Sequence, residues 1–184
     1  MTPSNLLKVS DEVFVAQDSI VTIGPTEIEI LKRTASTSPR QRARICAHKD
    51  HSDAIQEMVI CISRESYIRP HRHMSKSESF HVIQGAADVV IFDDEGRITD
   101  IVELGDETTR RAFFYRLPAG TYHTLLIKTD FFLVHEVTNG PFRVADAQLA
   151  PWSPSEEIVE DVLDYVEKLK KEVDARGNTA PFRH

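Results

Sequence analysis

Short apolar runs separated by turn-forming residues dominate the middle of the chain. Seven such runs occur between Ile55 and Pro141: Glu57–Ile62, Phe80–Gln84, Ala87–Phe92, Ile98–Leu104, Ala112–Leu117, His123–Ile127 and Phe131–Val137. Gly, Pro, Asp or Asn lies between most of them, and the acidic stretch 93–96 ends in Gly96, a typical hairpin signal. Many short strands at regular spacing, without helices between them, predict an antiparallel β-barrel or β-sandwich over residues 55–152.

The first 54 residues have a mixed pattern. Thr26 followed by Glu29 three residues later predicts the start of a short helix. In the segment Gln41–His48, polar and apolar residues alternate, which indicates a strand with one polar face. We therefore expect residues 1–54 to form an N-terminal extension that packs on the barrel.

The C-terminal part has a helical pattern. Ser153-Pro-Ser-Glu156 is a capping-box sequence with proline at the first helical position. Apolar residues then recur every three or four positions: Ile158, Val159, Val162, Leu163, Val166, Leu169 and Val173. This predicts an amphipathic helix over residues 153–177, ended by Gly177, and a tail over 178–184. Its polar face is mixed in charge, so we expect it to pack on the barrel or on a second subunit.

Composition narrows the classes of partner. The chain has 184 residues, 41% of them hydrophobic, and a formal net charge of −7. An acidic protein of this kind is not expected to bind nucleic acid or anionic membranes, which need a basic surface. No apolar run approaches a membrane span, and the first residues do not resemble a secretory signal. The two cysteines, Cys46 and Cys61, are expected to be reduced, partly buried thiols of a cytoplasmic protein, although a disulfide between them is an alternative.

The candidate chemistry lies in two segments that carry histidines. In a strand, His71 and His73 present their imidazoles on the same side, and Glu78 follows after a short loop. A later turn, Pro118-Ala-Gly-Thr-Tyr, leads to His123. Three imidazoles and one carboxylate suit a divalent Fe, Mn, Ni, Co or Zn ion. Four protein ligands on a six-coordinate ion would leave two positions for water or substrate; scattered surface histidines are the alternative.

The spacing of these residues resembles a known family pattern. His-x-His, four residues, Glu, six residues and Gly resembles the first cupin motif, and Pro-x-Gly-x-x-His resembles the second. The resemblance implies a mainly β cupin fold, a double-stranded β-helix or jelly-roll barrel, with the metal inside it. A homodimer is also implied.

A narrower resemblance covers most of the chain. The segments 42–48, 66–73, 92–96, 118–124, 136–142 and 150–156 resemble the WbuC family of cupin-fold metalloproteins. That family is named from gene clusters for bacterial surface polysaccharide (O-antigen), and its reaction is not established. The resemblance therefore implies a fold and a connection with surface-polysaccharide synthesis, but it does not imply a particular reaction.

Three further residues are catalytic candidates. Strand alternation sends Arg69 inward with the histidines, where it would bind a carboxylate or phosphate or form an ion pair at the rim. Glu136 and His135 point to opposite faces, and the position of Glu136 resembles the family's, so it is the candidate for supporting a ligand. Tyr122 is a candidate general acid, with packing as its alternative.

Residues farther from the motifs have weaker signals. Arg42, Arg44 and His48 would form the far wall of the pocket or pair with acids. His81 lies three residues after Glu78, so alternation directs it away from the metal.

Two functional hypotheses of different class follow. The first is a metal-dependent enzyme, of isomerase, epimerase or dioxygenase type, acting on a small polar substrate such as an activated sugar. The second is a non-catalytic module that binds a small molecule, and a purely structural metal site is a third reading. No classical hydrolase nucleophile, phosphate loop or dinucleotide fingerprint is present.

Overall fold

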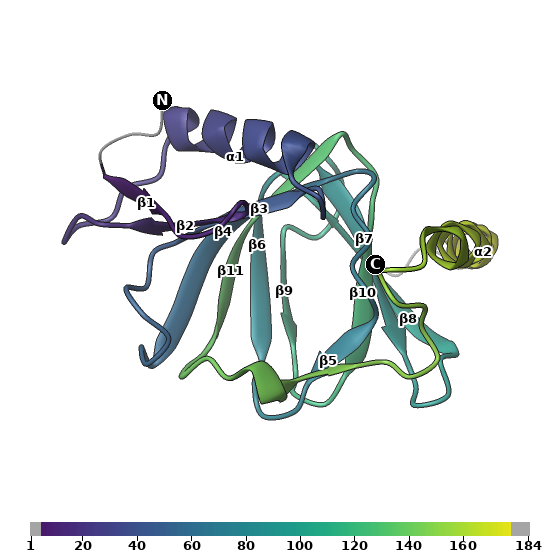
Figure 1. Ribbon diagram of the computed structural model, residues 1–184. Helices are drawn as coiled ribbons and strands as arrows, with labels where there is room; N and C mark the ends of the chain where they lie inside the picture. Colours follow the sequence, from purple (N-terminus) through teal and green to yellow (C-terminus); the bar gives the residue numbers. More distant parts are fainter. Residues whose placement is uncertain (1–4, 178–184) are drawn as a thin grey trace.

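The computed structural model describes residues 5–177, which form two β-sheets and two helices (Figure 1). The larger sheet has the strand order β1-β2-β3-β4-β11-β6-β9, and the smaller has the order β12-β5-β10-β7-β8. The strands of the larger sheet are β1 (Leu6–Lys8), β2 (Val13–Ala16), β3 (Arg42–Cys46), β4 (Ile55–Ser63), β6 (Glu78–Gln84), β9 (Phe114–Leu117) and β11 (Phe131–Asn139). Those of the smaller sheet are β5 (His71–His73), β7 (Ala86–Phe92), β8 (Ile98–Gly105), β10 (Tyr122–Ile127) and β12 (Ala147–Leu149).

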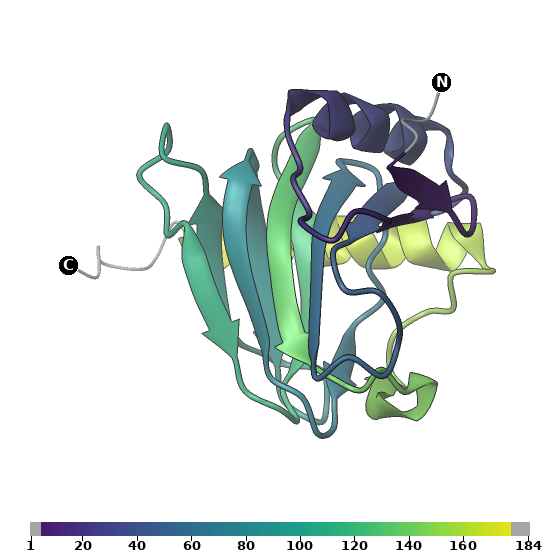
Figure 2. The same cartoon turned by 90° about the vertical axis from the view of Figure 1, so that its left-hand side faces the viewer.

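From β4 to β12 the chain changes sheet at every step except between β7 and β8, which form a hairpin in the smaller sheet, and nearly all strand pairs are antiparallel. The exception is the pair of β2 with β3, which is parallel. Strands that fold back between two facing sheets make the double-stranded β-helix of a cupin barrel, as the motif resemblance implies. The N-terminal extension does more than pack on this barrel, because β1, β2 and β3 continue its larger sheet (Figure 2).

Helix α1 (Pro25–Thr37) covers the outer face of β3 and β4. Its buried residues Ile30, Leu31 and Ala35 share an apolar cluster with Ala43 and Ile45 of β3. Residues two apart in a strand share a face, so the alternate positions, 42 and 44, must point into the barrel.

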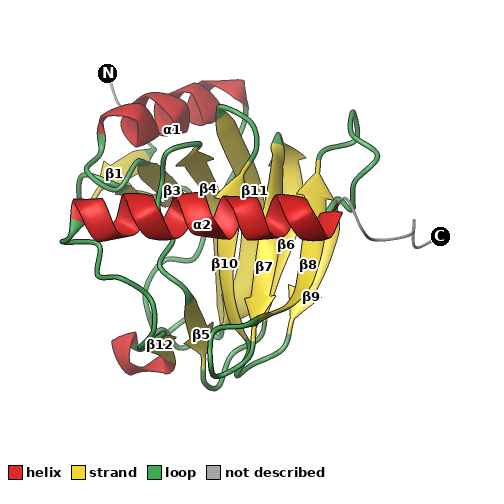
Figure 3. Ribbon diagram, turned by 90° about the vertical axis from the view of Figure 1, so that its right-hand side faces the viewer, coloured by secondary structure: helices red, strands yellow, loops and turns green. Residues whose placement is uncertain are grey.

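Helix α2 (Val159–Gly177) crosses the outer face of the smaller sheet (Figure 3). Every residue of β10 is buried, which explains why its sequence shows little polar alternation. Tyr122 and Leu126 lie in the cluster with α2 residues Leu169 and Val173, whereas Leu125 belongs to the barrel core. Both faces of this strand are thus covered.

The barrel interior is apolar at one end and polar at the other. Along β11, Phe132 and Val134 lie in the core cluster, and Glu136, two residues farther on, reaches a cavity. Strand β10 repeats the gradient, from Leu125 in the core to His123 at the cavity. The apolar end provides the folding core, and the polar end is free for chemistry.

The structure corrects the predicted start of α1. It begins at Pro25 after Gly24, whose N–H donates to Glu27 Oε2 at 2.9 Å. Thr26 is therefore inside the helix, and the prediction of Thr26 as the cap was wrong, because proline at the first helical position sets an earlier start.

The start of α2 also differs from prediction. It begins at Val159, not near Ser153, and Ser153 accepts a hydrogen bond from Arg69 Nε at 3.0 Å. The Ser153 hydroxyl donates to Ala150 O at 2.8 Å, so it cannot cap a helix. The helix continues to Gly177, the last described residue, so its predicted end there stays a prediction, and the predicted tail 178–184 lies outside the described residues.

The sequence pattern did not predict the three-residue strands β1 and β12, nor β2 and the 3-10 helix Val144–Asp146. Both cysteines are buried free thiols, as expected. Within residues 5–177, neither helix combines the length and the hydropathy that a bilayer span requires.

Candidate metal centre

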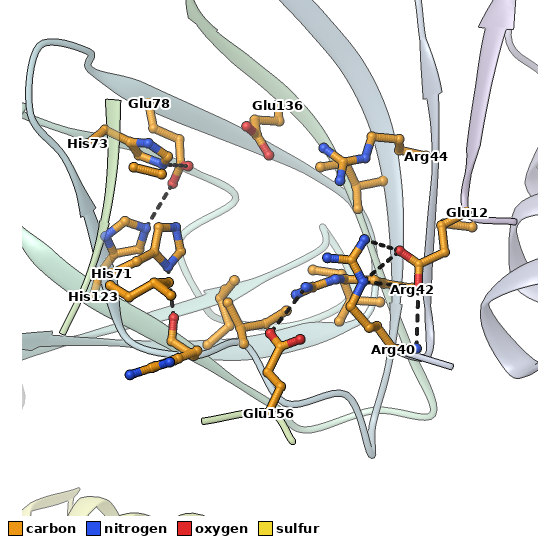
Figure 4. A pocket seen from close by; sticks show the side chains of 18 of the residues that line it. Glu12, Arg40, Arg42, Arg44, His71, His73, Glu78, His123, Glu136 and Glu156 are labelled. Carbon is orange, nitrogen blue, oxygen red and sulfur yellow. Dashed lines mark hydrogen bonds and ion pairs between the residues drawn. The ribbon is translucent and has the colours of Figure 1, made fainter. Parts of the chain in front are cut away.

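Three histidines converge on the cavity side of the smaller sheet. Strands β5 and β10 are antiparallel neighbours, and their register places His71 directly opposite His123. His73 lies two residues after His71 and therefore shares its face. One ring nitrogen from each residue lies within 4.8 Å of the others, which makes this a group that could hold a metal ion (Figure 4).

Hydrogen bonds fix which ring nitrogen is available for a metal. His71 Nδ1 lies 2.9 Å from Arg69 O, and His123 Nδ1 lies 3.1 Å from Thr121 O. Because a carbonyl can only accept, both Nδ1 atoms carry the proton and donate it, which leaves each Nε2 with a free lone pair. Support of this kind orients metal-binding histidines in proteins.

His71 is also held in the neutral form that a metal requires. Burial, and after it the nearby charge of His123, lowers the pKa of His71 to about 3. The imidazole is therefore uncharged throughout the neutral pH range, and no proton has to be displaced before Nε2 can bind a cation.

Glu78 reaches the histidines from the other sheet, at the start of β6. Its Oε2 lies 3.4 Å from His73 Nε2, and its Oε1 lies 3.5 Å from His123 Nε2. Burial would raise the pKa of Glu78, but the positive charge and hydrogen bond that His123 supplies when protonated, together with hydrogen bonds from His73 and Tyr115, hold it well below its usual range. An ionised carboxylate beside three imidazoles is a donor set that fits a borderline divalent ion.

Tyr115 supports this carboxylate, and sequence reasoning missed it. It lies on β9 opposite Phe80 of β6, and its hydroxyl donates to Glu78 Oε1 at 2.7 Å. Strand alternation in the predicted segment Ala112–Leu117 would have placed Tyr115 on one face with Leu117, which was the available signal.

We expect Tyr115→Phe to weaken divalent-ion affinity by about 10- to 100-fold, because the substitution removes a hydrogen bond that orients a proposed ligand. Competition with a chromophoric chelator would measure this. Tyr67→Phe is the matched control, since the Tyr67 hydroxyl donates to Pro154 O at 3.2 Å, away from the histidines. Equal affinity in both variants would contradict the role given to Tyr115.

The histidines form one wall of a cavity of about 690 Å³ between the two sheets. Arg42 and Arg44 of β3 lie on the opposite wall, and Glu136 lies between the two walls (Figure 4). Apolar side chains, among them Ile60, Phe80 and Leu125, line the remainder. This volume is in the range of pockets for small molecules.

Glu136 is a catalytic candidate that the structure places in the same cavity as the histidines. It lines the cavity, while its neighbour His135 points outward, with Nε2 3.6 Å from Glu57 Oε1. Burial, and then the negative charge of Glu78, raises the pKa of Glu136 above its usual value. No hydrogen bond to its side chain occurs among residues 5–177.

Arg69 and Tyr122 occupy different positions. Arg69 lines the cavity, but its guanidinium donates to Ser153 Oγ at 3.0 Å and to Ser153 O at 3.1 Å, which fastens the segment leading to α2. Tyr122 lies on the face of β10 opposite His123, with its ring 5.9 Å from that of Trp152. The structure does not bring Tyr122 to the cavity, because adjacent strand residues face opposite ways.

His48 lies outside the large cavity. It lines an adjoining cavity of about 300 Å³, which shares His73, Arg44 and Glu136 with the large one. Its Nδ1 lies 2.9 Å from Glu57 O. His81 is exposed on the outer face of β6, beside Phe113, as alternation predicted.

Comparison with family models matches one domain of unknown function, DUF6016, over residues 23–104. This region includes His71, His73 and Glu78 but not His123, and it is less than half of the chain. No curated protein matches the chain significantly. The narrower WbuC resemblance therefore stays a prediction.

Solved structures with a similar arrangement share little sequence with this chain. Protein SO0799 from Shewanella oneidensis is 15% identical, with a TM-score of 0.48, over 58% of this chain and 72% of that one. Oxalate decarboxylase from Bacillus subtilis is 20% identical, with a TM-score of 0.43, over 53% of this chain and 24% of that one. A hypothetical protein from Leishmania major is 17% identical, with a TM-score of 0.43, over 58% and 75% of the two chains. Likeness at this level carries no inference about ligand or reaction.

Proposed function

We propose that this cupin binds one divalent cation through His71, His73 and His123, with Glu78 as the fourth ligand, and that it is a metal-dependent enzyme. The convergence of three imidazole nitrogens within 4.8 Å, on the wall of a 690 Å³ cavity, carries this proposal. A structural metal site would be closed by its ligands. These histidines instead face space in which a small polar substrate fits.

In this proposal the metal ligands, the carbonyl groups that orient them and Glu136 have different roles. A divalent ion bound there would supply Lewis acidity toward a carbonyl or hydroxyl oxygen of the substrate. Arg69 O and Thr121 O keep the Nε2 atoms of His71 and His123 aimed at the cavity. Glu136 faces the cavity, and its carboxyl oxygens are free to accept a proton from a substrate or return one.

Arg69 and Tyr122 receive no catalytic task. The guanidinium of Arg69 is engaged by Ser153, and Tyr122 faces the α2 side of β10. A sugar or sugar nucleotide of surface-polysaccharide synthesis, a homodimer and a cytoplasmic location stay predictions from the sequence.

Reconstitution and turnover assays test this proposal. The protein would be loaded separately with Fe²⁺, Mn²⁺, Co²⁺, Ni²⁺ or Zn²⁺ and incubated with nucleotide sugars and 2-oxo acids, with and without oxygen. We expect product formation that requires the ion and is lost in Glu136→Gln. Thermal stabilisation by a compound without product would instead favour the alternative, a non-catalytic small-molecule-binding module.

A further inference from the structure

The arginines on the wall opposite the histidines are placed there by the packing of β3. Ala43 and Ile45 lie beneath α1 and are at most 2% exposed. Their neighbours Arg42 and Arg44 must therefore face the cavity, which both of them line. Arginine side chains usually lie on the protein surface. Two guanidinium groups that point into a barrel therefore indicate a role other than solubility.

The three arginines of this wall differ in their protein partners. Arg40, just before β3, forms a two-point ion pair with Glu12: its Nε lies 2.9 Å from Glu12 Oε2, and its Nη2 also contacts that carboxylate. Arg42 has a weak partner, with Nη2 3.4 Å from Glu156 Oε1. Its Nε is buried and has no hydrogen-bond partner within residues 5–177.

Arg44 has the poorest set of partners. The one contact found for its guanidinium among the described side chains is Nη1 to Met58 Sδ at 3.9 Å, and a thioether is a weak acceptor. No ion pair within 4.0 Å joins it to Glu136, whose carboxyl lies between Arg44 and the histidines in Figure 4. A guanidinium offers five donors in a planar fork, so most of those of Arg44 face the cavity without an acceptor.

We propose that Arg42 and Arg44 bind an oxyanion group, a carboxylate or a phosphate, of the ligand whose other end reaches the metal centre. This inference depends on the proposed function only for the statement that the ligand also reaches the metal. The binding of an oxyanion by the two arginines does not depend on it. Arginine forks bind both kinds of oxyanion through paired, charge-assisted hydrogen bonds. The histidine wall would bind the cation and the arginine wall would bind the anionic group. Together they would orient a single small acid across the cavity.

Charges of both signs act on Arg42. Burial, and then the positive charge of Arg40, lowers the pKa of Arg42, whereas the charges of Glu156 and Glu12 raise it. Glu156, the acid nearest to Arg42, is 37% exposed and lies at the start of the segment that leads to α2. It would compete with a ligand for Arg42, and removing its charge should therefore strengthen anion binding.

Isothermal titration with four probes tests the proposal: inorganic phosphate, glucose 1-phosphate, pyruvate and uncharged glucose. The comparison of phosphate with pyruvate distinguishes the two oxyanions, and glucose shows whether charge is needed. We expect at least one anion to bind, with about tenfold or greater loss of affinity in Arg44→Gln and in Arg42→Gln. Glu156→Gln should change affinity in the opposite direction, by a few-fold.

Arg64→Gln is the matched control, because Arg64 is an exposed arginine paired with Asp130, away from the cavity. Arg44→Lys keeps the charge and removes the fork, so binding weaker than wild type in this variant identifies paired hydrogen bonds. Melting of each variant without ligand shows whether it is folded.

The outcomes separate this inference from the proposed function. Anion binding that persists in metal-stripped protein and depends on Arg44 supports the inference even when no metal-dependent turnover exists. Anion affinity unchanged in both arginine variants, or no binding of any anion to metal-loaded protein, would overturn it and leave the metal centre untouched.

Discussion

Replacing His71 or His123 by alanine is expected to abolish stoichiometric metal binding. Each variant should fall from about one divalent ion per chain to a small fraction of that, because three ligands cannot compensate for a lost imidazole in a preformed site. Elemental analysis of protein purified without an affinity tag would measure the content. Adding metal at about 100 times its Kd should stabilise the wild type by about 2.7 kcal/mol, and neither variant to that extent.

His81→Ala is the control for both histidine variants. His81 lies only three residues from Glu78, but its side chain is on the outer face of β6. It should keep the full ion content and the full thermal response. If His71→Ala and His123→Ala also retained both, the histidine cluster would not be a metal site.

Replacing Phe132 by alanine is expected to have the largest effect on stability. Phe132 is 0% exposed and lies on β11, which pairs with β4 on one side and β6 on the other. Loss of the ring would leave a hole in the apolar end of the barrel, at a cost of about 3–5 kcal/mol in the free energy of unfolding. Chemical denaturation followed by circular dichroism would measure this cost.

Phe114→Ala removes the same side chain from the same sheet at an exposed position. Phe114 is 52% exposed on the edge strand β9, so we expect a change within about 0.5 kcal/mol. Comparable costs at positions 114 and 132 would show that the assignment of the barrel core is wrong.

Local patterns predicted most strands of the barrel and the group of metal-ligand candidates. Apolar runs such as Ala87–Phe92 and His123–Ile127 coincide with β7 and β10 to within one residue. These segments were predictable because both faces of each strand are buried, so the apolar signal is strong. The pair His71 and His73 was recognisable for another local reason, since two residues apart in a strand share a face.

Short elements escaped prediction because their stability comes from pairing with distant residues. Strand β12 has three exposed residues, and it is a strand because it pairs with β5. The start of α2 depends on Arg69, which lies 84 residues before Ser153 and engages its side chain. No local pattern around Ser153 contains that interaction.

The sequence alone determined a β-rich barrel, two flanking helices and a set of histidines suited to a divalent ion, because periodicity and spacing are local properties. The tertiary structure decided what surrounds those histidines. It brought Tyr115 to Glu78, turned Tyr122 away, and placed Arg44 across the cavity with the Met58 thioether as its acceptor among residues 5–177. These outcomes depend on which face of each strand a helix covers, and packing between distant segments sets that choice.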